Sequence, residues 1–400
     1  MVVVQINFSC TWGSTGKICD SVSKLLSENN IENYIFYTYG KNPQKNANYI
    51  RYGNLLYEKY QGLKARVFGN YGFNSFSATR YLIRKLEKIK PDVVHIHNIH
   101  GHDCHFEKLF CYLKEKNIKV FYTFHDCWTF TGYCPHFIMA KCDNWLSGCG
   151  NCILRRRYSW FFDKSERNFS RKKEALLGLD LTVITPSRWL ADLVKQSFLK
   201  ETTVKVINNG IDLCTFKPSE SNFRKTNNLQ DKKIVLGVSM GWSNAKGVDV
   251  FVRLANSLPN NYQIVLIGTD DKVDSILPNN ILSIHRTQNQ KELAEIYSAA
   301  DLFVNPTREE NYPTVNMEAL ACGTPVLTFR TGGSPEMLDA TCGSVVDCDD
   351  IDALEKEIIR ICTEKPYSKE ACINKAKEFD KNERFKEYLA LYERVESSGN

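Results

Sequence analysis

The sequence of 400 residues predicts an α/β chain of two doubly wound, Rossmann-like parallel-sheet domains that face a cleft, with a helix at the C-terminus. Three observations lead to this fold class. The chain is longer than one hydrophobic core usually serves. Short apolar runs alternate with helical periodicity from end to end, which is the βαβ pattern of parallel sheets. The turn-rich residues 208–212 and the polar residues 219–231 interrupt this alternation, so we place the domains at 1–212 and 213–400.

In the first domain, apolar runs predict strands, and stretches with apolar residues three and four positions apart predict helices. The expected strands are Val2–Asn7, Tyr34–Thr38, Val93–Asn98, Lys119–Phe124, Leu181–Thr185 and Val204–Ile207. The expected helices are Thr15–Ser27, Thr79–Lys88, Phe106–Lys116 and Arg188–Phe198.

The second domain repeats the pattern. Its expected strands are Lys233–Val238, Tyr262–Gly268, Ile281–Ile284, Asp301–Val304 and Pro325–Phe329. Its expected helices are Val248–Ser257, Lys291–Ala299, Val315–Ala321, Asp352–Cys362, Ser368–Phe379 and a charged terminal helix over about 382–396. Doubly wound sheets bind ligands at the carboxyl ends of their strands, so we expect the site in the cleft between the domains.

Composition excludes several classes of protein. Apolar residues make up 43% of the chain and charged residues 24%, which is typical of a globular enzyme and not of a disordered or fibrous chain. No apolar run reaches the ~18 residues that span a bilayer. Residues 1–8 lack the basic segment and cleavage site of a signal peptide. These features predict a cytoplasmic protein whose 15 cysteines are reduced thiols.

Positive charge is concentrated in the first domain. Residues 1–212 carry 30 Lys and Arg against 18 Asp and Glu (+12), whereas residues 213–400 carry 22 against 28 (−6). Basic residues cluster at Arg80–Lys90, where apolar side chains accompany them, and again at Arg155–Arg157 and Arg171–Lys173. A solvated surface explains this charge, and so does an anionic membrane or a phosphate-bearing substrate. We therefore expect peripheral binding to the inner face of the membrane, and no nucleic-acid partner, because no nucleic-acid motif is present.

A glycine pair follows the first expected strand. Gly13 and Gly16 open a helix, where glycine lets backbone amides approach a ligand and the helix N-terminus favours phosphate. The spacing matches neither the dinucleotide fingerprint nor the P-loop. A tight turn explains the pair as well as a phosphate site does.

The segment with the clearest chemistry runs from Arg308 to Val326. Glu310 follows a predicted strand, and Glu318 lies about two turns into the next helix, so both carboxylates can accept hydrogen bonds from sugar hydroxyls. The unpaired amides at the start of that helix favour an anion. Two surface carboxylates alone would not explain this combination, nor the Gly-Thr-Pro turn at 323–325.

This segment resembles the Glu-x7-Glu signature of the family 4 retaining glycosyltransferases, whose two-domain fold is called GT-B. Further motifs that resemble the family are His125-Asp126, Thr185-Pro186-Ser187, Asn209–Asp212 and Lys246-Gly247, so the resemblance covers nearly the whole chain. Within this family, the chain resembles the bacterial exopolysaccharide and colanic-acid-type glycosyltransferases.

The resemblance implies an enzyme that moves a sugar, with retention, from a nucleoside-diphosphate sugar to a glycan or lipid-linked acceptor in bacterial surface polysaccharide synthesis. It implies that the chemistry needs no cofactor. The implied catalytic residues are His125 and Glu310, and the implied donor-binding residues are Gly13, Gly16, Lys246, Asn311, Tyr312, Thr314, Val315 and Glu318.

Other interpretations stay open beside this one. They are a non-catalytic sugar-binding relative and a nucleotide-sugar epimerase or phosphorylase of the same fold. The intact Glu310, Lys246 and His125, and the lack of a recognisable pyridoxal-phosphate lysine motif, favour the transferase.

Two positions depart from the family pattern. Residues 239–245 contain no arginine, although many relatives have one shortly before the lysine. The diphosphate charge would then be balanced by Lys246, backbone amides or another residue. Pro313 stands where many relatives have glycine, and proline has no N–H to offer a ligand.

A cysteine-rich insertion is expected over 127–157. Its cysteines Cys134, Cys142, Cys149 and Cys152 end in a Cys-x2-Cys pair, which is compatible with a structural zinc site. Ordinary packing of thiols explains the spacing equally well.

Histidines are concentrated between His95 and His105, where five of the eight lie. His95 and His97 share one face of a predicted strand, which is compatible with a metal, but lining of the acceptor side of the cleft is the favoured interpretation. Asp347-Cys348-Asp349 resembles a metal-binding Asp-x-Asp motif, and there a surface turn is favoured.

Overall fold

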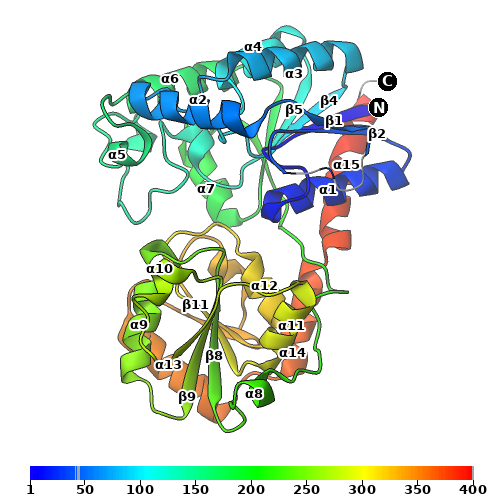
Figure 1. The fold of residues 1–400 in the computed structure, drawn as a ribbon. Coiled ribbons are helices and arrows are strands. Elements are labelled where there is room, and N and C mark those ends of the chain that lie inside the picture. Colours follow the sequence, from blue (N-terminus) through cyan, green and yellow to red (C-terminus); the bar gives the residue numbers. More distant parts are fainter. Residues whose placement is uncertain (41, 43–45, 399–400) are drawn as a thin grey trace. The chain divides into compact units, whose positions relative to one another are not determined.

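The computed structural model describes residues 1–40, 42 and 46–398. The chain forms two compact units (Figure 1). The first contains Met1–Ile207 and the chain from Phe385 onward, and the second contains Asn208–Arg384. Each unit holds one parallel sheet with helices on both faces, as the sequence predicts.

The sheet of the first unit has seven strands in the order β3-β2-β1-β4-β5-β6-β7. The strands are β1 (Val2–Ile6), β2 (Glu32–Tyr37), β3 (Tyr49–Arg51), β4 (Val93–Ile96), β5 (Lys119–Thr123), β6 (Leu181–Thr185) and β7 (Thr203–Val206). The helices are α1 (Gly13–Glu28), α2 (Leu55–Phe68), α3 (Phe76–Ile89), α4 (Phe106–Glu115), α5 (Arg155–Tyr158), α6 (Ser165–Leu176) and α7 (Arg188–Gln196), with single turns at Trp128–Phe130 and Asn144–Leu146. The strand order reverses between β1 and β4, which is where ligands bind in doubly wound sheets.

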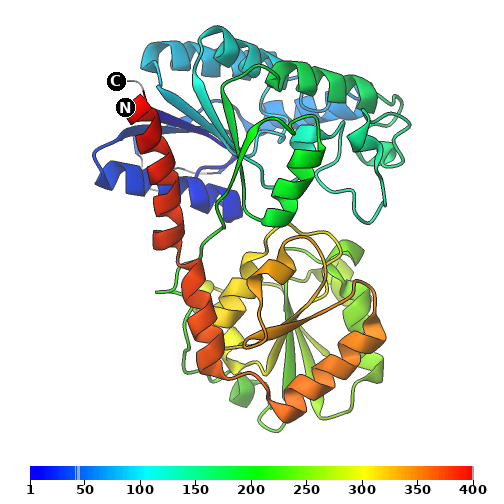
Figure 2. The ribbon, with the colours of Figure 1, turned by 180° about the vertical axis from the view of Figure 1, so that it is seen from behind.

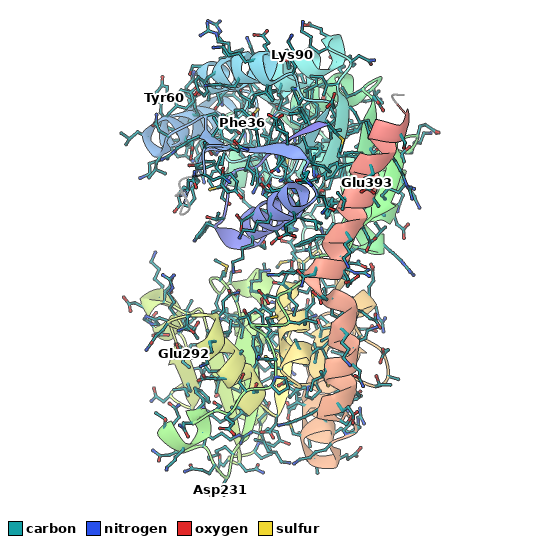
Figure 3. The ribbon with its side chains drawn as sticks, turned by 90° about the vertical axis from the view of Figure 1, so that its right-hand side faces the viewer. Phe36, Tyr60, Lys90, Asp231, Glu292 and Glu393 are labelled. Carbon is teal, nitrogen blue, oxygen red and sulfur yellow. The ribbon has the colours of Figure 1, made fainter. Side chains whose placement is uncertain are left out.

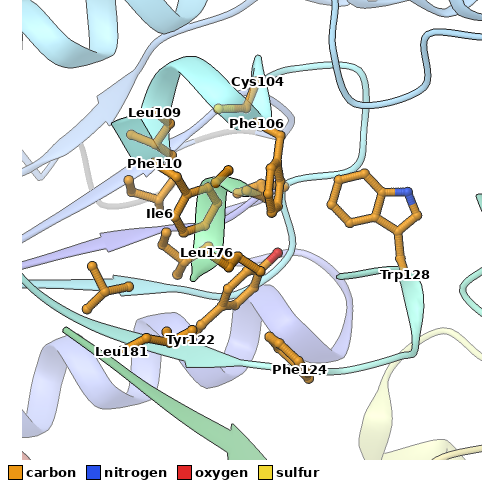
Figure 4. Packing of buried hydrophobic residues seen from close by; sticks show 14 of the residues in the cluster. Ile6, Cys104, Phe106, Leu109, Phe110, Tyr122, Phe124, Trp128, Leu176 and Leu181 are labelled. Carbon is orange, nitrogen blue, oxygen red and sulfur yellow. The ribbon is translucent and has the colours of Figure 1, made fainter. Parts of the chain in front are cut away.

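One face of this sheet carries the larger core. Buried side chains of α3, α4, α6 and α7 pack there against alternate residues of the strands. Figure 4 shows Tyr122 of β5 beside Phe106 and Phe110 of α4, with Trp128 at the edge of the cluster. The cysteine-rich insertion is anchored to the same core through Cys134 and Trp145.

The opposite face is covered by α1 and by the terminal helix α15 (Lys381–Ser398). Phe385, Tyr388 and Tyr392 of this helix pack on Val3 and Phe121. The sequence prediction placed all of 213–400 in the second domain, and this is wrong for the chain from Phe385 onward. The physical reason is that α1 covers only part of the apolar face, and the aromatic side of α15 completes it. Figure 2 shows this helix in red from behind.

The second unit has a six-stranded sheet in the order β10-β9-β8-β11-β12-β13. The strands are β8 (Lys233–Val238), β9 (Tyr262–Ile267), β10 (Ile281–Ile284), β11 (Leu302–Asn305), β12 (Val326–Phe329) and β13 (Gly343–Val346). The helices are α8 (Phe223–Thr226), α9 (Val248–Ser257), α10 (Asp271–Asp274), α11 (Gln290–Ala299), α12 (Thr314–Ala321), α13 (Ile351–Glu364) and α14 (Lys369–Ala376), with single turns at Asn244–Lys246, Ser334–Met337 and Lys377–Phe379. Here the order reverses between β8 and β11.

Helices again divide between the two faces of this sheet. Helices α9 and α13 pack on one face, whereas α11, α12 and α14 pack on the other. The elements not predicted from the sequence are the helices α2 and α6, the four-residue helices α5, α8 and α10, and the edge strands β3 and β13.

Candidate active site

The reversal point of the second sheet brings Lys246 and Glu310 together. Lys246 ends the turn between β8 and α9, and Glu310 lies in the loop after β11. Their side chains form an ion pair, with Nζ and Oε2 2.6 Å apart, and both remain partly exposed. Two residues that the sequence prediction named separately thus lie in contact at the edge of the sheet where ligands bind.

The turn that carries Lys246 is packed tightly against the loop after β11. Gly247 has φ +77°, and a Cβ there would lie 2.4 Å from the carbonyl oxygen of Pro306. The backbone N–H of Arg308 and the hydroxyl of Thr307 both donate to the carbonyl of Ala245, at 2.9 and 3.2 Å. The position of Lys246 is therefore set by the neighbouring loop as well as by its own turn.

Arg308 is the basic residue nearest in sequence to Glu310, and its side chain is bonded to other side chains of the second unit. Its guanidinium makes two hydrogen bonds of 2.8 Å to the carboxylate of Asp249 and one of 2.6 Å to Asp349. These bonds raise its pKa further above its usual range, and its side chain is only 11% exposed. Sequence reasoning missed this role, although Arg308 opens the signature segment. The arginine absent from residues 239–245 is not replaced by Arg308.

Helix α12 begins beside this pair. Pro313 is its N-cap residue, so the first amides that can face an anion belong to Thr314 and Val315. Glu318 is half-buried on this helix and accepts a 3.2 Å hydrogen bond from the hydroxyl of Tyr297, a partner that the sequence did not reveal.

The loop over 310–312 is held in place by burial and by hydrogen bonds. Asn311 and Tyr312 are both buried, and Tyr312 belongs to the core beneath α12. The amide of Asn311 donates to Glu310 Oε1 at 3.1 Å, and the amide of Gly333 donates to the carbonyl of Asn311 at 2.7 Å. Burial directs the Asn311 and Tyr312 side chains toward the protein, so we expect their main effect on a ligand to be through the loop backbone.

The glycine pair of the first unit lies at the other reversal point. Gly13 begins α1 with φ +71° and has open space where a Cβ would stand. A Cβ on Gly16 would lie 2.5 Å from Ser9 Oγ, so this glycine serves close packing of the β1–α1 turn. The two glycines therefore differ: only Gly13 leaves its backbone accessible.

His125 follows β5 and is half-buried beside the buried His97. Its Nε2 is 3.3 Å from Nδ1 of His97, and Nε2 of His97 is 3.3 Å from Oε1 of Gln5. Burial lowers the pKa of His125 to about 4 and that of His97 well below its usual range. Both rings, together with His100 and Asp126, line a cavity of about 10 Å³, which is room for about one water.

Asp126 is ionised within this cluster. Burial alone would raise its pKa, but the neighbouring His100 lowers it to about 2, and His100 Nε2 lies 2.8 Å from Asp126 Oδ2. The hydroxyl of Tyr71 lies 3.3 Å from the other ring nitrogen of His100. Both nitrogens of His100 are thus engaged in the structure.

His95 belongs to the core and does not line a cleft. It is fully buried, with its ring nitrogens 2.5 Å from the hydroxyl of Tyr392 and 2.8 Å from that of Thr123. The expectation of cleft lining is therefore wrong for His95, because α15 covers that face of the sheet.

The four cysteines of the insertion lie near one another. A hydrogen bond between the thiols of Cys134 and Cys152 raises the pKa of the first and lowers that of the second. Among the described residues, however, the one group with three metal-ligating atoms within 4.8 Å of each other is Asp271, Asp274 and His285, which is exposed. The four sulfur atoms therefore lie farther apart than the ligands of a tetrahedral zinc site.

Comparison with known proteins decides the family. The description "Glycosyltransferase Family 4" matches residues 18–214, and "Glycosyl transferases group 1" matches residues 219–379. The chain belongs to the family 4 glycosyltransferases. It is therefore a sugar-transferring enzyme with the GT-B fold.

Relatives of known name are distant in sequence. A protein of Escherichia coli K12, named as a candidate colanic acid biosynthesis glycosyl transferase, is 22% identical over 88% of both chains. An N,N'-diacetylbacillosaminyl-diphospho-undecaprenol α-1,3-N-acetylgalactosaminyltransferase of Campylobacter jejuni is 28% identical over 51% of this family 4 chain and 58% of its own.

Solved structures agree on the fold. A sucrose-phosphate synthase of Thermosynechococcus elongatus superposes with a TM-score of 0.72 at 17% identity, covering 99% of each chain. The Anabaena protein HepE, solved with UDP and glucose, superposes with a TM-score of 0.69 at 14% identity, covering 98% of this chain and all of its own.

Among the residues that the structure describes, no helix of this family 4 enzyme has both the length and the apolar composition to cross a membrane.

Proposed function

We propose that this glycosyltransferase binds a nucleoside-diphosphate sugar on its second unit and transfers the sugar with retention to a glycan or lipid-linked acceptor of bacterial surface polysaccharide. The observation that carries the proposal is the contact between Lys246 and Glu310 at the reversal point of the sheet, beside the start of α12. A cation and a helix N-terminus favour the negative charge of a diphosphate, and a carboxylate accepts hydrogen bonds from sugar hydroxyls.

Each group has a distinct task in this proposal. Lys246 and the amides of Thr314 and Val315 stabilise the diphosphate, and Glu318 accepts hydrogen bonds from the ribose hydroxyls. Glu310 accepts hydrogen bonds from hydroxyls of the donor sugar, with its carboxylate held by Lys246 at 2.6 Å. His125 contacts the sugar, and Gly13 offers backbone amides at the start of α1.

The anomeric configuration is retained because the acceptor hydroxyl attacks the anomeric carbon on the same face from which the diphosphate leaves. The acceptor hydroxyl forms the new bond to the anomeric carbon as the bond to the diphosphate breaks, and a diphosphate oxygen takes the hydroxyl proton. Negative charge then grows on the leaving diphosphate, where Lys246 and the α12 amides oppose it. This chemistry uses no cofactor.

A lipid-linked acceptor is supported by the relatives and by the surface of the first unit. The Campylobacter relative is named for an undecaprenol-linked substrate. We define the α2 face as Leu55, Leu56, Lys59, Tyr60, Leu63, Lys64, Arg66 and Phe68. Its apolar members are exposed, Leu56 by 78%, and Figure 3 shows Tyr60 at the outer edge of the unit.

The α2 face continues into neighbouring segments. The backbone N–H of Trp160 donates to the carbonyl of Arg66, which places the exposed aromatic run Trp160–Phe162 at the end of α2. Helix α3 is joined to α2 by a 2.7 Å hydrogen bond from Ser77 Oγ to the hydroxyl of Tyr57, and its Phe76, Arg80, Tyr81 and Arg84 line a depression of about 360 Å³. Exposed apolar and aromatic side chains bordered by Lys and Arg fit an anionic bilayer surface.

The structure changes which helix this proposal depends on. The sequence prediction relied on the apolar stripe within Arg80–Lys90, but Leu82 and Leu86 of that stripe are buried in the core. The exposed side of α3 carries basic side chains together with Phe76 and Tyr81. The apolar contact with a membrane is therefore assigned to α2 and to Trp160–Phe162.

For the cysteine insertion we retain one structural zinc ion on Cys134, Cys142, Cys149 and Cys152 as a proposal. Its support is the proximity of the four thiols. Binding would require the sulfurs to move closer together than they lie in the structure.

The donor is tested by a thermal-shift screen of nucleoside-diphosphate sugars, since a ligand at 100 times its Kd stabilises by ~2.7 kcal/mol. The sugar that binds is then used to measure transfer by the Glu310→Ala variant. We expect transfer to be lost while the melting temperature stays near that of the wild type. Glu370→Ala, on the exposed side of α14, is the matched control and should keep full activity. Wild-type turnover in Glu310→Ala would refute the assignment.

The membrane partner is tested by sedimentation with vesicles of phosphatidylcholine alone or mixed with phosphatidylglycerol. Binding should require the anionic lipid and weaken with salt, because the Debye length falls from ~10 Å at 0.1 M to ~3 Å at 1 M. It should weaken in Leu56→Ser with Leu63→Ser and in Arg80→Glu with Arg84→Glu. Lys356→Glu on α13 is the control. Equal recovery from both vesicles would assign these residues to an ordinary solvated surface.

A further inference from the structure

The buried partners of His125 determine where its proton lies. The chain of contacts starts at Gln5 in β1, whose Nε2 donates to the carbonyl oxygen of Cys19 at 3.0 Å. A carbonyl oxygen can only accept a hydrogen bond, so the amide nitrogen of Gln5 must face Cys19. Its Oε1 therefore faces His97.

The position of the Gln5 amide also determines which ring nitrogen of His97 carries a proton. Because Oε1 of Gln5 only accepts, the Nε2 of His97 that lies 3.3 Å from it must carry a proton. His97 is 2% exposed, and burial keeps its ring neutral by lowering its pKa. A neutral imidazole has one N–H, so Nδ1 of His97 carries a lone pair and accepts a hydrogen bond.

The donor to that lone pair is Nε2 of His125, 3.3 Å away, with the two rings nearly parallel at 18°. We infer that His97 is a positioning residue that holds His125 in the Nε2–H tautomer. Three hydrogen bonds then run in one direction, from His125 to His97, from His97 to Gln5, and from Gln5 to the backbone.

His95 does not disturb this chain. Its ring lies 4.1 Å from that of His97 between centroids, but its own nitrogens contact the hydroxyls of Tyr392 and Thr123. His95 is thus as buried as His97 and adjacent to it, and no hydrogen bond joins it to His125 among the contacts described. It provides a matched control.

The tautomer limits what His125 can do, and this consequence rests on the proposed function. With the proton on Nε2, Nδ1 carries the lone pair, so a sugar hydroxyl that meets that edge of the ring donates and His125 accepts. His125 then orients the donor sugar and does not supply a proton to the departing diphosphate.

The tautomer can be read by ¹⁵N NMR of the full chain labelled at histidine, without any substrate. The two ring nitrogens have different shifts when one is protonated, and assignment comes from loss of the signals in each variant. We expect wild-type His125 to show a protonated Nε2 and an unprotonated Nδ1 throughout pH 6–8. His97→Asn, which retains an acceptor near the position of Nδ1, should preserve this pattern, and His95→Asn should as well. His97→Leu should mix the two tautomers.

An Nδ1–H form of His125 in the wild type, or an unchanged pattern in His97→Leu, would overturn the inference. A second readout uses the nucleotide sugar found in the donor screen. His97→Leu should lower kcat/KM about tenfold, the effect of one misplaced hydrogen bond, whereas His97→Asn should restore most of it. A chain that binds no nucleotide sugar would refute the proposed function alone, because the NMR result needs no ligand.

Discussion

Lys246 and Glu310 carry opposite charges on side chains that are both partly exposed, so water screens their attraction. Such pairs contribute little to stability, ~0–1 kcal/mol. Their proximity matters instead for a ligand, because a diphosphate would be neutralised by Lys246 at the point where Glu310 meets the sugar. Arg308, which a reader of the sequence would take as a second cation, is already bonded to Asp249 and Asp349.

We predict that Lys246→Ala lowers turnover by ~100–1000-fold, since loss of one preorganised group that stabilises developing charge costs ~3 kcal/mol. The free energy of unfolding should change by less than ~1 kcal/mol. Steady-state kinetics and urea unfolding check the two parts. Lys356→Ala, exposed on α13, controls for loss of a positive charge. A loss of turnover below tenfold would mean that another cation binds the diphosphate.

Among the elements, the turn between β8 and α9 determines where Lys246 stands. Gly247 needs to be glycine for two reasons, its φ of +77° and the carbonyl of Pro306 against its Cα. Gly241, on the same loop, shares only the first reason: its φ is +99°, and nothing lies within 4 Å of a Cβ placed there.

Substitutions at Gly241 and Gly247 separate the effect of backbone strain from the effect of a steric clash. Gly241→Ala should cost ~1 kcal/mol of stability from the positive φ alone. We predict that Gly247→Ala costs more and also lowers kcat/KM at least tenfold, because the turn with Lys246 must shift. Unfolding and kinetic measurements on both variants test this. Equal effects of the two substitutions would show that the contact with Pro306 has no part in placing Lys246.

The insertion with the four cysteines allows a direct measurement. Metal analysis of protein purified without chelator should find one zinc per chain if the proposal holds. Serine at Cys149 should then abolish zinc binding, while serine at the exposed Cys111 of α4 should not. Zinc-free protein would return the four thiols to ordinary packing.

How far the sequence predicts these elements depends on where their apolar residues point. The alternation of strands and helices was sufficient for most of both sheets, and the meeting of Lys246 and Glu310 follows from β8 and β11 being neighbours at the reversal point. Helix α2 was missed because Leu56, Tyr60 and Leu63 face outward, so no inward apolar stripe marks it. The edge strand β3 has only three residues, and the edge strand β13 begins with Gly343 and Ser344, so neither contains the apolar run that marks a strand. The hydrogen-bonded chain through His97 depends on contacts between distant strands, which no local pattern encodes.

For the whole molecule, the two units differ in their response to acid. Burial lowers the pKa of five histidines, all in the first unit: His95 to about 3, His102, His105 and His125 to about 4, and His97 by a large shift in the same direction. In the second unit, the hydrogen bond to Asp274 raises the pKa of His285.

The sign of the effect follows from proton uptake. Between the usual histidine pKa near ~6.5 and about 4, the unfolded chain binds protons that the folded first unit does not. The stability of the first unit is therefore lost as pH falls through this window, by ~1.4 kcal/mol per pH unit for each histidine. We predict that at pH 5 the amides of the first sheet lose protection from hydrogen exchange, whereas the amides of the second sheet keep theirs. Loss of protection in both sheets together would contradict this.

The terminal helix also imposes an order on synthesis. When the ribosome has made residues up to Ile207, the face of the first sheet with Val3, Phe121 and His95 still lacks its cover, because Phe385, Tyr388 and Tyr392 do not yet exist. All of Asn208–Arg384 must be translated before these side chains emerge. Until then the nascent chain exposes an apolar surface that holding chaperones would recognise, and a ribosome stalled late in the message would leave the amino-terminal half unfinished. The chain completes its first unit only after it has made its second.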